Sequence, residues 1–295
     1  MGQTTTQDRN WQDKSWQSTD GLTLHYRDYA GRKAKREDRP PILCIPGLTR
    51  NARDFEPVAD AFAGEWRVIV VNLRGRGESD YSKDPQTYKP STYVEDIVSL
   101  LDHAGLEQVV AIGTSLGGIV SMLMALQHPD RFAGVVLNDI GPDVEEAGLD
   151  RIRGYVGHGG SYPTWMHAAR ALKDGNDDIY PHFEMRDWLR FAKRMMVVGN
   201  SGRISFDYDM KIAEPFLAPP PAPINMWPLF EALAGRPVLA LRGELSDILS
   251  PATLDRMQKT LPEMTAVTVP GVGHAPTLEE PDAKEAIARL LGQVA

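Results

Sequence analysis

The chain has 295 residues, of which 42% are apolar, and its formal net charge at pH 7 is −8. This apolar content suits a globular protein with a sizeable core. The negative charge disfavours nucleic acid or an anionic membrane as a partner, because phosphate groups are bound by basic surfaces. One basic stretch, residues 31–39, also contains Glu37 and Asp38, and we expect a solvated loop there.

The cysteine content and the hydropathy of the sequence indicate which cellular compartment and which cofactors are compatible with it. Cys44 is the only cysteine, so no intramolecular disulfide and no cysteine cluster for zinc can form, and we expect Cys44 on a buried strand. The first 15 residues lack the apolar core of a signal peptide, and no apolar run is long enough to cross a membrane. These features favour a cytoplasmic protein.

The first predicted elements are strands. Residues 1–14 are polar and are predicted to be a flexible N-terminus. In residues 15–29, apolar and polar side chains alternate on both sides of Asp20-Gly21. This pattern predicts a β-hairpin. Short, nearly all-apolar runs, typical of strands buried on both faces of a parallel sheet, follow at residues 40–48, 67–75, 108–115, 132–141, 236–243 and 264–271.

Helical patterns lie between most of these strands. They cover residues 53–64, 92–105, 116–129, 250–262 and 280–294. Ser250-Pro251 is typical of an N-cap followed by proline at the first helical position. The alternation of strand and helix predicts an α/β fold with a mostly parallel central sheet covered by helices on both faces.

The alternation is interrupted once, between residues 141 and 233. This segment contains helix-like stretches at 164–173 and 187–198, ends in a proline-rich piece at 214–228, and has no β-rich run. We therefore predict a helical insertion into a core domain made of residues 15–140 and 234–295.

The sequence GTSLG at residues 113–117 matches G-x-S-x-G. It follows a predicted strand and opens a predicted helix, which is the context of a nucleophilic serine on a sharp, strained turn. Gly113 and Gly117 would also suit tight packing alone, but the strand–turn–helix context favours Ser115 as a nucleophile. Backbone amides at the start of the helix could then stabilise an oxyanion.

A serine nucleophile requires a base and an acid that orients it, in the chain order serine, acid, histidine for this motif. His274 follows the last predicted strand between Gly273 and Ala275 and is the predicted base. His128 precedes a proline at a helix end and fits a local cap better. His158, His167 and His182 fall in the insertion, where they could line a pocket but fit solvated helix faces better. His25 and His103 lie far from the end of the chain.

Two carboxylates could be the acid, and both follow predicted strands. Asp247 lies in the loop after residues 236–243, and Asp139 lies at the end of residues 132–141. Both should lie at the carboxyl edge of the sheet, where the sites of open α/β sheets are found. We favour Asp247 from its loop position next to the His274 segment.

Together these motifs resemble the α/β-hydrolase superfamily. The matching segments are residues 45–55, 70–80, 111–118, 241–247 and 269–281, in the family's order. The resemblance covers the chain from about residue 15 to its end apart from the insertion, and it implies Ser115, Asp247 and His274 as the catalytic triad. The insertion then resembles the helical cap that covers the active site in this family.

The resemblance also implies an oxyanion hole formed by the backbone N–H groups of Leu48 and Leu116. Many members have His-Gly before the first of these positions, whereas this chain has Pro46-Gly47. The glycine-rich residues 72–80 lack the lysine and hydroxyl of a phosphate-binding loop and are predicted to be a structural turn.

Substrate-binding residues are predicted from the insertion and from the segment after Leu48. Aromatic side chains of the insertion indicate an apolar pocket, although each could instead be a packing residue; they are Trp165, Trp188, Phe216 and Trp227. Arg50 could reach a substrate carboxylate, or it could be solvated.

These observations predict a serine hydrolase of a carboxylic ester or lactone that requires no cofactor and no metal. A C–C bond hydrolase of a meta-cleavage-type dienoate is the alternative, and a non-catalytic binding protein on the same fold is a third possibility. C–C hydrolases tend to have tryptophan after the catalytic histidine, whereas Ala275 and Pro276 follow His274. With no second cation in a nearby motif, we expect a small to medium-sized, uncharged ester. An aspartate nucleophile, as in epoxide hydrolases, is disfavoured by Ser115.

Overall fold

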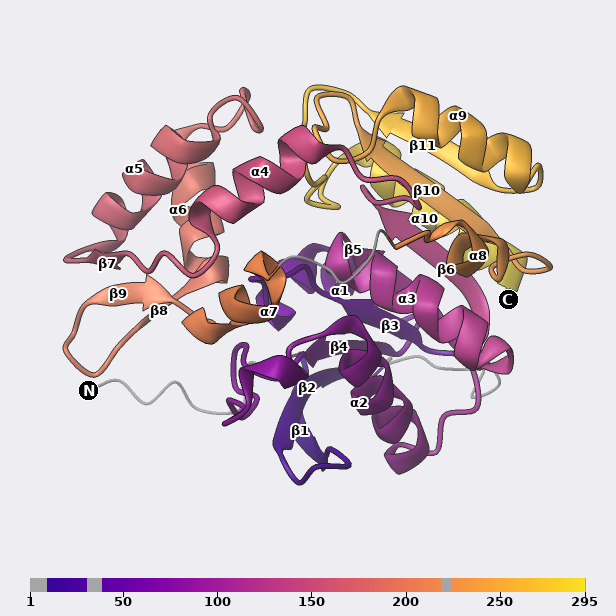
Figure 1. Ribbon diagram of the computed structural model, residues 1–295, viewed down its shortest axis with the longest axis horizontal. Coiled ribbons are helices and arrows are strands. Elements are labelled where there is room, and N and C mark those ends of the chain that lie inside the picture. The colour runs from indigo at the N-terminus through magenta and orange to yellow at the C-terminus, as the bar shows by residue number, and fades with distance from the viewer. Residues whose placement is uncertain (1–9, 31–38, 219–223, 295) are drawn as a thin grey trace.

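The computed structural model describes residues 10–30, 39–218 and 224–294 (Figure 1). Within these residues, an eight-stranded sheet has the order β1-β2-β4-β3-β5-β6-β10-β11. β1 pairs antiparallel with β2 and β2 with β4, while the remaining neighbours are parallel. The strands are β1 (Gln12–Gln17), β2 (Thr23–Tyr29), β3 (Ile42–Ile45), β4 (Val68–Asn72), β5 (Val109–Thr114), β6 (Phe132–Asn138), β10 (Val238–Gly243) and β11 (Thr265–Val269).

Helices cover both faces of this sheet. α2 (Pro90–His103) and α3 (Leu116–Gln127) share one buried apolar cluster with α9 (Pro251–Thr260). α1 (Glu56–Phe62) and α10 (Pro281–Val294) contribute to a second cluster against the opposite face. The predicted α/β fold with a mostly parallel, doubly covered sheet is confirmed. Short 3₁₀ helices are η1 (Ala52–Phe55), η2 (Pro85–Thr87), η3 (Pro129–Arg131) and η4 (Met210–Ile212).

The N-terminal segment is more ordered than its polarity predicted. β1 begins at Gln12, so the predicted flexible segment of residues 1–14 extends too far. The polar side chains of β1 form ion pairs with β2, since Lys14 Nζ lies 2.6 Å from Asp28 Oδ2. Residues 1–9 and most of the basic stretch, 31–38, lie outside the described residues.

The insertion connects β6 to β10 and includes both helices and strands. Its helices are α4 (Glu146–Tyr155), α5 (Trp165–Asn176), α6 (Met185–Met195), α7 (Ala213–Leu217) and α8 (Trp227–Glu231). Its strands form a small antiparallel sheet in the order β7 (Ser161–Tyr162), β9 (Ile204–Phe206) and β8 (Met196–Val198). Figure 1 shows α4, α5, α6 and this sheet standing to one side of the central sheet.

The expectation of a purely helical insertion was therefore wrong at β7, β8 and β9. The helix predicted over 187–198 ends at Met195, and the β-branched Val197 and Val198 pair with β9 instead. Part of the proline-rich piece, residues 219–223, lies outside the described residues.

The turn between β5 and α3 has an unusual backbone. Ser115 has a φ of 51° and a ψ of −114°, a strained conformation for a residue with a side chain. A Cβ at Gly117 would lie 2.0 Å from the carbonyl oxygen of Ile45, and one at Gly113 would lie 2.4 Å from the carbonyl oxygen of Gly117. The two glycines thus let β3, β5 and α3 approach closely enough to hold the strained serine.

We predict that Gly117→Ala destabilises the fold, because the added methyl meets backbone that cannot move alone. The expected loss is about 1–3 kcal/mol or more, as for overpacked cores, measured as a lower Tm. Gly292→Ala is the control, since Gly292 is exposed in α10 and a Cβ there meets no atom within 4 Å. This control should keep or raise Tm. A wild-type Tm for Gly117→Ala would contradict the close approach.

Candidate active site

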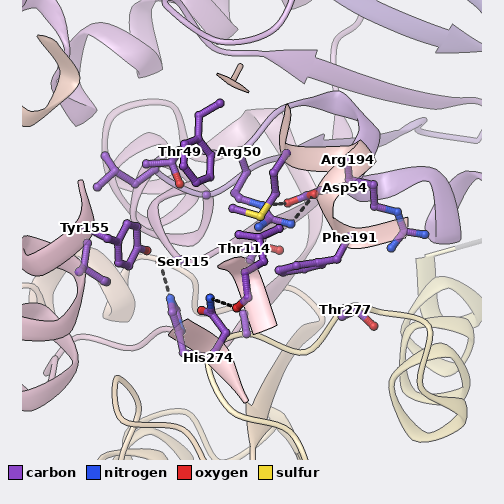
Figure 2. A pocket seen from close by; sticks show the side chains of 18 of the residues that line it. Thr49, Arg50, Asp54, Thr114, Ser115, Tyr155, Phe191, Arg194, His274 and Thr277 are labelled. Carbon is purple, nitrogen blue, oxygen red and sulfur yellow. Dashed lines mark hydrogen bonds and ion pairs between the residues drawn. The ribbon is translucent and has the colours of Figure 1, made fainter. Parts of the chain in front are cut away.

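Ser115 and His274 meet at the carboxyl edge of the central sheet. Ser115 lies between β5 and α3, and its Oγ is 2.9 Å from His274 Nε2 (Figure 2). His274 Nδ1 is 2.8 Å from Asp139 Oδ2. A carboxylate can only accept a hydrogen bond here, so Nδ1–H donates to Asp139 and Nε2 is left to accept the Ser115 proton.

Asp139 is fully buried and directly follows β6. β6 pairs with β5 so that Asn138 lies opposite Thr114, which brings Asp139 beside the serine turn. Its Oδ1 accepts a hydrogen bond from the Gly243 amide at 2.7 Å, and its Oδ2 also accepts one from Ser246 Oγ at 2.6 Å. Three donors therefore compensate the loss of water around this carboxylate.

The sequence-based preference for Asp247 was wrong. Asp247 Oδ2 and Oδ1 accept hydrogen bonds from Arg151 Nε at 2.6 Å and Nη2 at 2.8 Å, and no hydrogen bond joins Asp247 to His274. Partial burial alone would raise the pKa of Asp247, but the bonds and charge of Arg151 outweigh it and lower the pKa. Both hydrogen bonds join Asp247 to α4 of the insertion.

Leu48 and Leu116 flank Ser115 at the ends of neighbouring strands. Leu116 is the first residue of α3, where helix amides have no partner within the helix. Leu48 follows β3, and its carbonyl accepts hydrogen bonds from Arg76 Nε at 2.9 Å and Nη2 at 2.8 Å. Arg76 is fully buried and also donates to Tyr93. The predicted structural turn over 72–80 thus positions the Leu48 peptide, a role that sequence analysis missed.

A cavity of about 320 Å³ lies over Ser115 and His274. Its walls come from the core and from the insertion, which contributes Tyr155, Tyr180 and Phe191. Figure 2 shows Tyr155 on the side of the cavity next to Ser115 and Phe191 on the other. The volume is near the lower limit of small-molecule sites, so the site suits a small substrate.

Arg50 lies in the wall of this cavity. This position agrees with the alternative in which Arg50 can reach a substrate, and not with a solvated side chain. Its side chain is only 17% exposed and forms a two-pronged ion pair with Asp54, which includes Nη2–Oδ1 at 2.7 Å. Its guanidinium carbon lies 4.4 Å from the centre of the Phe191 ring. Burial would lower the pKa of Arg50, but Asp54 outweighs this effect and raises it.

The predicted aromatic lining is not found in the cavity wall. None of Trp165, Phe216 and Trp227 contributes to the cavity within the described residues. Trp227 packs on Phe230, and its Nε1 donates to Asp143 at 3.0 Å. Phe216 packs against the apolar cluster that includes α2 and α3, and Trp165 packs against the cluster that includes α1 and α10. Other aromatic side chains of the insertion line the cavity instead.

Trp188 is buried in the packing of the insertion. It is fully inaccessible and contacts the rings of Tyr180, Phe183 and Phe191 edge-on. This cluster places Tyr180 and Phe191 so that they also face the cavity. Local sequence could not separate these roles, because both need large apolar side chains.

Residues 10–30, 39–218 and 224–294 contain no cluster of three or more histidine, cysteine or acidic side chains that could hold a metal ion. They also contain no helix that is long and apolar enough to cross a membrane.

Comparison with known proteins finds relatives that match most of the chain by sequence. The chain is 34% identical to a 3-hydroxybutyrate-oligomer hydrolase of Cupriavidus necator over 248 residues, which are 81% of this chain and 84% of the relative. Residues 40–156 match the family model described as alpha/beta hydrolase fold. The chain belongs to the α/β-hydrolase family.

Two further proteins are similar to most of the chain. A crystal structure of an α/β hydrolase from Novosphingobium aromaticivorans is 57% identical, has a TM-score of 0.91, and aligns with 96% of this chain and 99% of its own. A 2-(acetamidomethylene)succinate hydrolase of Mesorhizobium japonicum is 28% identical, with 80% of this chain and 81% of the relative covered. The resemblance predicted from the motifs is thereby confirmed.

We predict that Asp139→Asn lowers kcat for a p-nitrophenyl ester by about 10⁴, the loss seen when a triad acid becomes an amide. The amide would stabilise the wrong tautomer of His274. Asparagine tolerates positive φ, and Asp139 has a φ of 57°, so the backbone should be kept.

Asp247→Asn is the matched control for this substitution. It changes a partly exposed ion pair, whose contribution is about 0–1 kcal/mol, and should alter kcat less than about tenfold. A larger loss for Asp247→Asn than for Asp139→Asn would contradict the assignment of the acid.

Proposed function

We propose that the protein is a serine hydrolase of carboxylic esters, including lactones, that acts through an acyl-enzyme. Ser115 is the nucleophile, His274 the general base and acid, and Asp139 the group that orients His274. The observation that carries this proposal is the continuous hydrogen-bond chain from Ser115 Oγ, which lines the cavity, through His274 to the buried Asp139.

In the first half of the reaction, His274 Nε2 takes the proton of Ser115 as Oγ attacks the ester carbonyl. Negative charge on the carbonyl oxygen is stabilised by the N–H groups of Leu48 and Leu116. Such donors contribute about 3–4 kcal/mol each in well-studied enzymes. His274 then gives its proton to the departing alcohol oxygen, and the acyl group remains on Ser115.

In the second half, His274 takes a proton from a water molecule that attacks the acyl carbonyl. The tetrahedral intermediate collapses, the proton returns to Ser115, and the carboxylic acid leaves. We propose that the insertion acts as a cap, since Tyr155, Tyr180 and Phe191 close the cavity over the serine. Limiting the access of water strengthens the electrostatic interactions within the site.

The ester assignment is supported by the relative from Cupriavidus necator, whose name specifies hydrolysis of 3-hydroxybutyrate oligomers. Units of a hydroxy acid are joined in an oligomer by ester bonds. The triad needs no metal or cofactor for this reaction, which agrees with the chemistry of its side chains.

Ser115→Ala should abolish ester turnover and leave Tm near the wild-type value, since the substitution removes chemistry rather than core volume. A serine-directed phosphonate should label Ser115 alone in the wild-type protein. Ser201→Ala, on an exposed loop, is the control and should keep full activity and labelling. Labelling at another serine, or turnover by Ser115→Ala, would refute the nucleophile assignment. Absence of both turnover and labelling in the wild-type protein would leave only a binding role for the fold.

C–C bond hydrolysis of a dienoate is the second candidate, because Arg50 is a cation fixed in the cavity wall. Ala275 and Pro276, which line the cavity after His274, disfavour it relative to C–C hydrolases with tryptophan there. We expect kcat/KM to be higher for short-chain esters than for a meta-cleavage dienoate. A hundredfold preference for the dienoate, about 2.7 kcal/mol of transition-state stabilisation, would instead establish the second candidate.

A further inference from the structure

Positive side chains predominate among the charged groups of the cavity wall. Arg50, Arg151 and Arg194 line the cavity, and Asp54 is the one carboxylate among the lining residues that the structure describes. Arg151 is paired with Asp247 and Arg194 with Glu279, and neither of these acids lines the cavity. These two acids therefore bind their arginines from outside the cavity, whereas the arginine side chains themselves line it.

Arg50 extends from the loop beside the serine. Its Cγ lies 3.4 Å and Ser115 Cβ 3.8 Å from the position that a Cβ would take at Gly47, so the two side chains start close together. Asp54 occupies Nε and Nη2 of Arg50. Nη1 has no hydrogen-bond partner among the described residues, so the end of the guanidinium is open to a ligand.

Arg151 extends from α4 and has the same arrangement. Asp247 occupies its Nε and Nη2, and its Nη1 has no partner in the described part of the chain. Tyr155 lies one helical turn further along α4 and lines the same cavity. Arg50, Arg151 and Tyr155 therefore share one cavity wall.

Two guanidinium ends that face one cavity are suited to a carboxylate. A guanidinium offers parallel N–H donors that match the two oxygens of a carboxylate, and such charge-assisted bonds are about twice as strong as neutral ones. An ion pair on the Nε side holds each guanidinium in place before the ligand arrives, which lowers the entropy lost on binding. A neutral substrate would leave these donors without a partner.

We propose that the cavity binds a small ester that also carries a free carboxylate, and that Arg50 and Arg151 hold this carboxylate while Ser115 attacks the ester carbonyl. This inference rests on the proposed ester hydrolysis. It replaces the sequence-based expectation of an uncharged ester, which assumed no second cation near Arg50. Arg151 is distant in sequence, and the fold brings it to the same wall.

The test compares esters that differ in charge but hardly in shape. Monoethyl succinate carries a carboxylate where ethyl levulinate carries an uncharged acetyl group of similar size. Monoethyl malonate and monoethyl glutarate vary the distance between carboxylate and ester. We expect kcat/KM for the best of the three half-esters to exceed that for ethyl levulinate by about tenfold or more, the effect of a charge-assisted hydrogen bond.

Single substitutions of the two arginines should remove this preference. Arg50→Gln and Arg151→Gln should each lower the ratio of half-ester to levulinate kcat/KM by about tenfold, mainly through KM for the half-ester. Arg50→Lys should restore part of the ratio, because it keeps the charge without the two-pronged geometry. Arg186→Gln is the control, since Arg186 lies on α6 with its side chain 80% exposed, and it should keep the wild-type ratio.

A further measurement needs no variant. Succinate should inhibit hydrolysis of ethyl levulinate by the wild-type protein competitively, and butanol of similar length should not. If Ser115-dependent turnover of ethyl levulinate occurs with no half-ester preference and no succinate inhibition, the carboxylate proposal is overturned and ester hydrolysis stands. If no ester is hydrolysed and the phosphonate does not label Ser115, the proposed function fails, and the carboxylate proposal fails with it.

Discussion

The buried carboxylate of Asp139 constrains the rest of the site. A charge without access to water must be compensated by donors, and these come from Gly243 at the end of β10, Ser246 in the following loop and His274 in the loop after β11. Two segments distant in sequence from Asp139, residues 243–246 and the loop that carries His274, are therefore fixed around one group. The orientation of His274, and with it the direction of its Nε2 towards Ser115, follows from this arrangement.

Ser115 is held from the opposite direction by backbone packing. Its left-handed φ is a local strain, which persists only where the surroundings leave no alternative. Gly113 and Gly117 supply those surroundings, because the backbone of α3 lies against β3 and β5 with no room for a side chain. Ser115 is thus rigidly positioned by the sheet, while much of the cavity wall around it comes from the insertion.

Sequence predicted the parts of this structure that depend on local pattern. Buried strands and amphipathic helices appear as short periodic runs, and Ser115 and His274 each stand out by their position after such a run. Asp139 could not be preferred over Asp247 in this way, because the choice depends on sheet order. β6 lies between β5 and β10, so the end of β6 adjoins the serine, although β10 is nearer to His274 in sequence.

The insertion could also be predicted only in part. The sequence pattern predicts helices there, but it does not predict which of their side chains face the cavity. The core supplies Ser115 and Arg50, and the insertion supplies Arg151. In the proposed complex a substrate carboxylate bridges these two parts of the chain, so the same contact that selects an acidic ester also holds the insertion over the serine. A neutral ester would lack this contact, although the aromatic side chains of the insertion would still limit the access of water.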